Sequence, residues 1–174
     1  MTTIPRPAPT EHADYYARYV ACVPEGDVLA HLREQGEHTR TLLQGVSETR
    51  AAHRYAPGKW SIKQVVGHML DTERLFGFRA LAFARADPSP LPSMDQDLWV
   101  EGADFDARSL ASIAIEFRAV RAATSAMFAG FSPNALLRTG IASGNTFTVR
   151  SLAYIVAGHE MYHLQILAER YGVE

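Results

Sequence analysis

The chain has 174 residues, of which 47% are hydrophobic and 21% charged, as is usual for a soluble globular domain. Its formal charge of −2 provides no basic field for nucleic acid, and no run approaches the about 18 apolar residues of a transmembrane helix. The only cysteine, Cys22, excludes an intrachain disulfide and a cysteine-based metal cage, and the lack of disulfides fits the cytoplasm. We therefore expect a cytoplasmic protein, and from its charge and hydrophobicity we expect no nucleic-acid or membrane partner.

Residues 1–27 are predicted to form an N-terminal arm. Three prolines within the first ten residues disfavour a helix there, and the segment lacks the hydrophobic stretch of a signal peptide. Residues 11–23 are predicted to form a short helix with Tyr15, Tyr16 and Tyr19 on one side. We interpret these tyrosines as packing residues that hold the arm against the main body, rather than as a binding site.

Hydrophobic residues recur at helical spacing in four longer segments. These segments are approximately residues 28–48, 61–86, 106–130 and 148–171. Ser61 and Gln64 form a capping box before the second segment, whose hydrophobic residues run nearly all round the helix, as expected for a central member of a bundle. Asp27 and Thr148 are the predicted N-caps of the first and last segments.

Two longer connections separate these helices. Residues 87–107 are rich in proline and acidic side chains, and residues 131–146 are polar and contain glycine, with a short extended piece predicted at 145–147. Long connections within compact domains are usually functional or covering elements. Residues 28–174 are therefore predicted to form one all-α domain, a four-helix bundle with long crossover loops.

His159 and His163 lie one turn apart on the hydrophobic side of the last helix, close enough to bind one metal ion together. Buried without an ion, each ring would need its own hydrogen-bond partner, whereas a shared cation satisfies both lone pairs. His68, on the hydrophobic second helix, is the best candidate for a third ligand. Three histidines with an open position are typical of catalytic zinc sites, although nickel, iron and manganese also accept imidazole.

The segment from His159 to His163 also matches the H-E-x-x-H motif of metalloproteases, in which Glu160 would be the general base. The extended protease motif would place its third ligand at Glu169 and a glycine at Ile166, and this chain has neither residue type there. A protease function is therefore disfavoured, while Glu160 remains a candidate base or a supporting residue of the site.

Several blocks of the sequence resemble the DinB-like superfamily over roughly residues 28–171. The blocks are Gly58-Lys59-Trp60-Ser61-Ile62-Lys63-Gln64-Val65-Val66-Gly67-His68, Asp71-Thr72-Glu73-Arg74, Arg79-Ala80-Leu81, Asp95-Gln96-Asp97 and the segment from Gly158 to Leu164. The resemblance implies a four-helix bundle that binds a metal through three histidines, here His68, His159 and His163.

Members of this superfamily include thiol S-transferases, a maleylpyruvate isomerase branch and proteins described only as metal-dependent hydrolases. The resemblance therefore implies a metal-dependent enzyme with a small-molecule substrate, and it also implies a homodimer. We expect an S-transferase that uses a low-molecular-weight thiol as cosubstrate and acts on small electrophiles. The alternatives are a hydrolase that uses a metal-bound water, and a non-catalytic stress or binding protein in which the metal only stabilises the bundle.

Charged residues beside the predicted site have two interpretations each. In one interpretation, Asp71 or Glu73 orients the imidazole of a histidine ligand. In the other, both belong to an ordinary solvent-exposed face of the second helix. Arg79 lies on the same helical face as the first histidine, where a buried guanidinium needs an anionic partner. We favour a pairing of Arg79 with Asp95 or Asp97 over the binding of an anionic substrate. The sequence does not identify catalytic or cosubstrate-binding residues.

Overall fold

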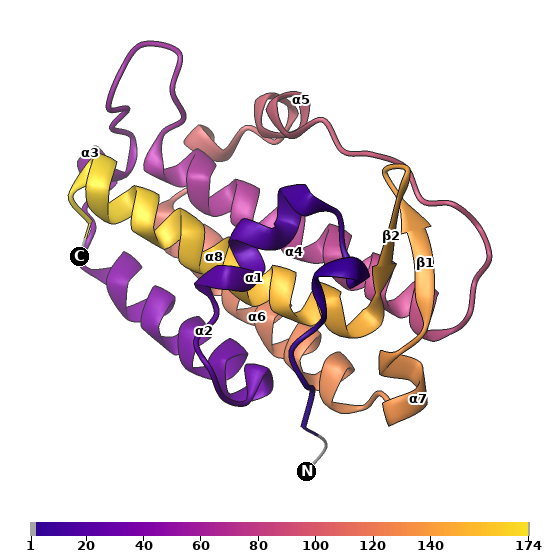
Figure 1. Ribbon diagram of the computed structural model, residues 1–174. Coiled ribbons are helices and arrows are strands. Elements are labelled where there is room, and N and C mark those ends of the chain that lie inside the picture. The colour runs from indigo at the N-terminus through magenta and orange to yellow at the C-terminus, as the bar shows by residue number, and fades with distance from the viewer. Residues whose placement is uncertain (1–2, 174) are drawn as a thin grey trace.

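The computed structural model describes residues 3–173 and is built mainly from helices (Figure 1). Four long helices form the bundle: α2 (Val28–Gln44), α4 (Ile62–Ala84), α6 (Leu110–Ala129) and α8 (Val149–Tyr171). Helix α2 packs on α6, and α4 packs on both α6 and α8. The predicted all-α four-helix bundle is therefore confirmed.

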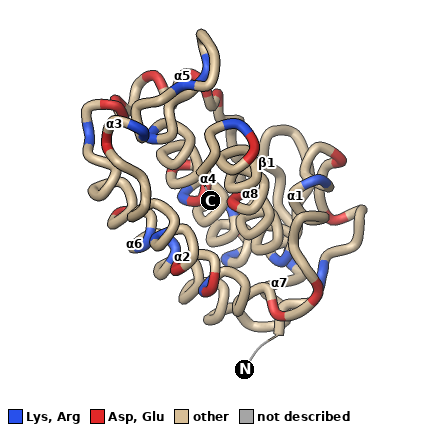
Figure 2. Tube along the Cα trace, turned by 90° about the vertical axis from the view of Figure 1, so that its left-hand side faces the viewer, with Lys and Arg blue, Asp and Glu red and all other residues tan. Residues whose placement is uncertain are grey.

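Shorter elements connect and cover these helices. They are η1 (Pro9–Glu11), η2 (Asp14–Tyr16), α1 (Ala17–Cys22), α3 (Glu48–Ala51), α5 (Gln96–Gly102), η3 (Phe105–Ala107), α7 (Pro133–Leu136), β1 (Thr139–Ala142) and β2 (Asn145–Thr148). Charged residues of both signs are interspersed along the molecule (Figure 2). Within residues 3–173, no helix combines the length and hydrophobicity needed to cross a bilayer.

Side-chain caps fix where the long helices begin. The Ser61 hydroxyl accepts a hydrogen bond from the Gln64 backbone at 3.1 Å, and the Gln64 side chain accepts one from the Ser61 backbone at 3.0 Å, which confirms the capping box. Asp27 and Thr148 cap α2 and α8 as predicted. Each cap contributes about 1 kcal/mol, and together they set the residue at which each helix starts.

The N-terminal arm contains less regular helix than predicted. The backbone is extended at His12 and Ala13, so only residues 17–22 form an α-helix instead of residues 11–23. Glu11 is drawn to the start of α8, where Arg150 and Thr148 donate hydrogen bonds to its carboxylate. This tertiary contact overrides local helix propensity.

Two other boundaries differ from the sequence prediction. Helix α2 ends at Gln44 rather than near residue 48, and a separate turn, α3, starts after the cap residue Ser47. Helix α6 starts after the cap residue Ser109 rather than at residues 106–107, because η3 and an extended Arg108 come first. Both differences come from serine caps inside segments whose hydrophobic periodicity continues across the break.

The second crossover folds into a hairpin. Strands β1 and β2 pair antiparallel with Thr139 opposite Thr148, which confirms the short extended piece predicted at residues 145–147. Leu91, from the long connection after α4, adds to the open edge through hydrogen bonds to Ile141 and Ser143 of 2.9 and 3.0 Å. The loop after α4 is thereby fixed against the hairpin, beside the C-terminal half of α4.

The hydrophobic core has two clusters, and the turn of α8 between them is polar. One cluster extends along α8 from Val149 to Ala157, and the other includes Leu167 and Tyr171. His159 and His163 lie on the intervening turn. The bundle therefore places these two histidines midway along α8, between the two hydrophobic clusters.

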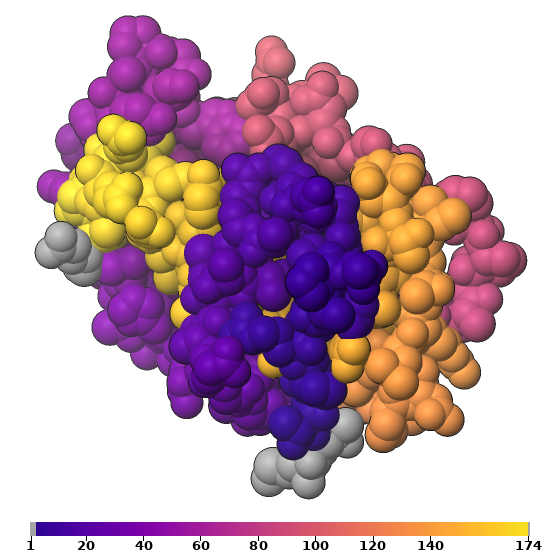
Figure 3. Space-filling view, viewed as in Figure 1, coloured from indigo at the N-terminus to yellow at the C-terminus, as the bar shows by residue number. Residues whose placement is uncertain are grey.

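The arm crosses α8 at a glycine. Figure 3 shows the arm covering the middle of α8, and a Cβ atom added at Gly158 would lie 1.8 Å from the carbonyl oxygen of Tyr19. Gly77 in α4 has no such neighbour, since its nearest contact would be 3.9 Å away. Only a residue without a side chain permits the approach of α1 to α8.

Gly158→Ala is therefore expected to displace α1 and to lower the free energy of unfolding by about 2–3 kcal/mol, as overpacking does. The matched control Gly77→Ala is expected to raise it by up to about 1 kcal/mol, because alanine is the better helix former. Urea unfolding followed by circular dichroism measures both changes. Equal stability of the two variants would contradict the tight crossing.

Candidate metal centre

The three predicted histidines come together between α4 and α8. One ring nitrogen from each of His68, His159 and His163 lies within 4.8 Å of the others, and the Nε2 atoms of His159 and His163 are 3.1 Å apart. Two nitrogens bound to one tetrahedral ion at about 2.1 Å lie roughly 3.4 Å apart, so this pair is already close to a suitable separation. Within residues 3–173, no further His, Cys, Asp or Glu side chain joins the group.

All three imidazoles are held in the neutral form. Burial lowers the pKa of His68 to about 4, and burial together with the neighbouring His68 lowers that of His163 to about 3. Burial, followed by His163 and His68, places the pKa of His159 well below its ordinary value. Neutral imidazole is the form that binds a metal. At most one of the two facing Nε2 atoms can donate to the other, whereas a transition-metal cation accepts the lone pairs of both, so this donor set fits such an ion.

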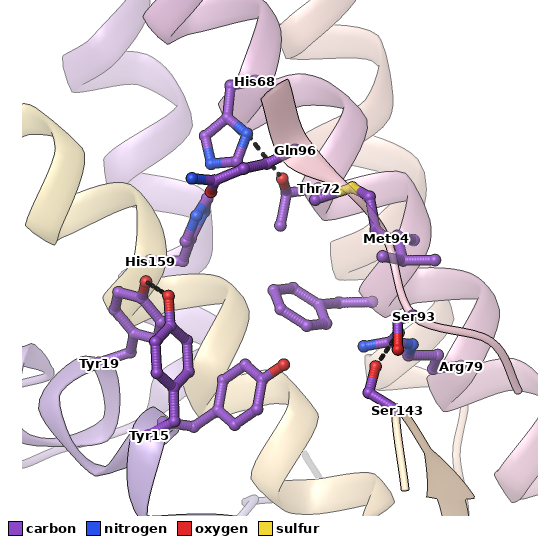
Figure 4. Close-up of a pocket in the computed structure, with 13 residues that line it drawn as sticks. Tyr15, Tyr19, His68, Thr72, Arg79, Ser93, Met94, Gln96, Ser143 and His159 are labelled. Atoms are coloured by element: carbon purple, nitrogen blue, oxygen red, sulfur yellow. Dashed lines mark hydrogen bonds between the residues drawn. The ribbon is translucent and has the colours of Figure 1, made fainter. Parts of the chain in front are cut away.

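Thr72, rather than a carboxylate, lies behind the first histidine. Its hydroxyl is 3.4 Å from Nδ1 of His68 (Figure 4). Asp71 instead receives a hydrogen bond from Arg74, and Glu73 is bound by Arg121. The prediction that Asp71 or Glu73 orients a ligand imidazole is therefore wrong.

Glu160 follows His159 in sequence but belongs to a different cluster. Its carboxylate accepts hydrogen bonds of 2.5 Å from the Arg121 guanidinium and from the Thr39 hydroxyl, and only 2% of the residue is exposed. Burial raises the pKa of Glu160, although Arg121 and Thr39 oppose the shift. Arg121 also binds Glu73 with N–O distances of 2.6 and 2.9 Å. Glu160 is occupied by these partners, which argues against its predicted role as a base.

The sequence analysis missed Arg121. The residue lies four positions after Phe117 and three before Thr124, both of which are buried, so its position on the inner face of α6 is visible in the helical spacing. An arginine on an otherwise hydrophobic face signals a buried partner of opposite charge. Which carboxylates it meets depends on how three other helices pack, and the spacing within α6 does not contain that information.

A cavity of 310 Å³ opens beside the histidines. His68 and His159 form part of its wall, together with Tyr15, Tyr16 and Tyr19 from the arm. The arm tyrosines do pack against the body as predicted, since Tyr16 contacts Phe76 and Phe147. The interpretation of packing alone is incomplete, however, because the same tyrosines enclose the candidate site (Figure 4).

His163 faces a second cavity of 380 Å³, which is also lined by Trp60 and Gln96. Gln96 is the first residue of α5 and lines both cavities. Its neighbour Asp95 caps α5 by accepting hydrogen bonds from the backbone of Asp97 and Leu98. The Asp-Gln-Asp segment thus anchors the long connection, and it places Gln96 in both cavities and Asp97 in the second one.

Glu11 ties the arm over this site, and its titration offers a test. Burial raises its pKa, but hydrogen bonds from Arg150, Ala8 and Thr148 outweigh burial and lower the pKa to about 2. A carboxylate with a lowered pKa stabilises the fold above its unfolded value of about 4.5, and this contribution is lost as the pH falls toward 2. Glu11→Gln is therefore expected to lower the free energy of unfolding at pH 7 by on the order of 1–2 kcal/mol, after allowance for solvent screening.

The difference between wild type and Glu11→Gln should shrink as the pH falls from 4.5 toward 2, because the native carboxylate then becomes protonated. Thermal unfolding at a series of pH values measures this convergence. A constant difference over the whole range would show that the loss comes from packing and not from the charge.

Comparisons with known proteins agree on the fold. A family model described as the DinB superfamily matches residues 31–167. A solved structure, YfiT from Bacillus subtilis, described as a probable metal-dependent hydrolase with an unusual four-helix bundle topology, superposes with a TM-score of 0.71 over 84% of this chain and 87% of its own. Its sequence is 15% identical, so this likeness shows the fold alone. No curated protein sequence matches the chain.

Proposed function

Because the chain belongs to the DinB superfamily, we propose that it is a metal-dependent enzyme that transfers a low-molecular-weight thiol to a small electrophile. The observation that supports this proposal is the convergence of three neutral histidines at the wall of a small cavity. We propose that His68, His159 and His163 bind one divalent ion, with zinc as the first choice and nickel, iron or manganese as alternatives.

Each residue of the site has a distinct task in this proposal. His159 and His163 present Nε2 atoms to the ion, and Thr72 accepts a hydrogen bond from Nδ1–H of His68, which leaves Nε2 of His68 free to bind. Three protein ligands leave a position open for a small molecule. Tyr19 packs its ring 5.2 Å from the ring of His159 and limits access of water to that position.

When bound, the ion would supply Lewis acidity, which lowers the pKa of a thiol at the open position. In the transfer, the S–H proton goes to solvent and the sulfur forms a bond to the electrophilic carbon. The leaving group departs with the electron pair of the bond that breaks. Tyr19 is not suited to removing the proton, because burial raises its pKa and keeps its hydroxyl protonated.

Hydrolysis is the second candidate, since the structurally similar YfiT is described as a probable metal-dependent hydrolase. The same ion would also lower the pKa of a bound water, but Glu160 is occupied by Arg121 and Thr39 and is not free to assist as a base. We further propose a cytoplasmic homodimer that binds small molecules rather than nucleic acid or membranes. The formal charge of −2 supports the lack of nucleic-acid partners and the single cysteine supports the cytoplasm, while the homodimer rests on the family resemblance.

The two reactions are distinguished by their dependence on thiol. Metal-loaded protein is incubated with 1-chloro-2,4-dinitrobenzene and, in turn, cysteine, glutathione or glucosamine-linked cysteine, and separately with p-nitrophenyl acetate without thiol. The proposal expects at least one thiol conjugate to form about 100-fold faster than without protein, and this rate should disappear in His159→Ala. Product formation from the ester alone would favour hydrolysis, and no reaction in either assay would favour a non-catalytic role.

A further inference from the structure

Arg79 is a buried cation whose charge is not neutralised by the protein. Only 2% of the residue is exposed, and its side chain lines the same cavity as His68. The predicted pairing with Asp95 or Asp97 is wrong, because Arg79 forms no ion pair within residues 3–173. None of the residues that line the cavity is acidic.

The hydrogen bonds of Arg79 leave much of its guanidinium unused. Both of its bonds come from Nη2, which donates to the carbonyl of Pro92 at 2.7 Å and to the hydroxyl of Ser143 at 2.9 Å. The Nε–H is buried and has no partner in the described part of the chain. A guanidinium has five N–H donors, and a buried charge is costly unless an anion faces it. A neutral carbonyl and a hydroxyl do not supply that anion.

The contrast with Arg121 shows that this fold can neutralise a buried arginine. Arg121 is 3% exposed and is bound by the carboxylates of Glu73 and Glu160. Arg79 is at least as buried, yet it faces a cavity instead of a carboxylate (Figure 4). The difference indicates that its counter-ion comes from outside the chain.

The neighbours of Arg79 hold its guanidinium in place. Ser143 lies at the turn of the hairpin in the left-handed region, with φ of 52°, and its backbone N–H donates to Leu91 at 3.0 Å. Pro92 directly follows Leu91, so this hydrogen bond joins the segment that carries Pro92 to the turn that carries Ser143. Both acceptors of Arg79 therefore belong to one hydrogen-bonded unit. An arginine positioned in advance loses little side-chain entropy when a ligand binds.

We propose that Arg79 binds the carboxylate of a small molecule whose sulfur reaches the three histidines. This inference rests on the proposed thiol transfer and names a class for its cosubstrate, a thiol that carries a carboxylate remote from the sulfur. Pro92 and Ser143 occupy only Nη2, so N–H donors of the guanidinium remain for a ligand, and a carboxylate oxygen accepts such a charge-assisted hydrogen bond. A cavity of 310 Å³ has room for such a molecule.

The spacing along α4 sets the length of this molecule. Arg79 follows His68 by eleven residues, which corresponds to about 16 Å along the helix axis. Side chains on a helix lean toward its N-terminus, so the long arginine reaches back toward the histidines. The sulfur and the carboxylate should therefore be separated by roughly 10 Å.

A matched pair of probes tests this inference. 8-Mercaptooctanoate has about the required length, and 8-mercaptooctan-1-ol differs from it by lacking the charge. Isothermal titration calorimetry of the Co(II)-loaded protein is expected to show about 10- to 100-fold tighter binding of the carboxylate, the usual effect of hydrogen bonds to a charged group. Arg79→Met should abolish this preference without weakening the binding of the alcohol.

Arg74→Met is the control on the same helix, because Arg74 is exposed and already paired with Glu116, and it should keep the preference. Equal affinity of wild type for the two probes would overturn the inference, and this comparison requires no variant to fold. The thiolate-to-cobalt absorption band is a separate readout. If the band is absent while the carboxylate still binds more tightly, the proposed thiol transfer fails and the anion site on Arg79 stands.

Discussion

His159→Ala is expected to abolish metal binding. The variant removes one of the three imidazoles that converge within 4.8 Å, and the two that remain come from different helices. Loss of a supporting residue alone costs 10- to 100-fold in metal affinity, so we expect loss of a ligand to cost more than about 100-fold. After incubation with zinc and dialysis, elemental analysis should find about one ion per chain in wild type and less than about a tenth in the variant.

His38→Ala is the matched control, because His38 lies on the exposed face of α2 and should leave the metal content unchanged. A second readout follows from linkage, since a ligand that binds only the folded state raises the unfolding temperature. A chelator should lower the unfolding temperature of wild type and of His38→Ala but not that of His159→Ala. Undiminished zinc in His159→Ala would refute the three-histidine site.

Arg121→Met is expected to cause the largest loss of stability, about 3–5 kcal/mol. The substitution provides an unbranched hydrophobic side chain but leaves the carboxylates of Glu73 and Glu160, 3% and 2% exposed, without a counter-charge in the core. The loss of stability arises mainly because the two buried carboxylates are left unpaired, rather than because their attraction to the guanidinium is lost. Urea unfolding followed by tryptophan fluorescence measures it.

Two comparisons isolate this cause. The triple variant Arg121→Met/Glu73→Gln/Glu160→Gln removes the charges together and should recover at least half of the loss. Arg118→Met removes an exposed arginine one turn earlier on α6, whose ion pair with Glu37 is 3.7 Å long and solvent-exposed, so it should cost at most about 1 kcal/mol. A loss in Arg121→Met no larger than in Arg118→Met would contradict the assignment of a buried charge cluster.

Local signals were sufficient to predict most of the bundle and the three histidines. Capping residues such as Ser61 and Thr148 act within a few positions of the helix start, and spacing of three and four residues places side chains on one face. His159 and His163 needed only this spacing. Their meeting with His68 also required the packing of α4 on α8, which the hydrophobic faces and the family resemblance both indicated.

The partners of individual charges were not predictable in this way. The sequence predicts a pairing of Arg79 with Asp95 or Asp97 of the long connection, but the hairpin formed by residues 139–148 supplies Ser143 instead. The H-E-x-x-H match makes Glu160 a candidate base, whereas its carboxylate is bound by Arg121, which is 39 residues away. Helical spacing gives the direction in which a side chain points but not the atoms it meets.

The buried charge cluster also bears on the alignment of the metal ligands. It joins all four long helices through Thr39 of α2, Glu73 of α4, Arg121 of α6 and Glu160 of α8. Glu73 directly follows Thr72, which contacts His68, and Glu160 directly follows His159. The cluster therefore restrains the rotation of α4 and α8 about their own axes. Helix α6 contributes none of the three histidines, but its Arg121 thus helps to fix the rotation of α4 and α8 that brings them together.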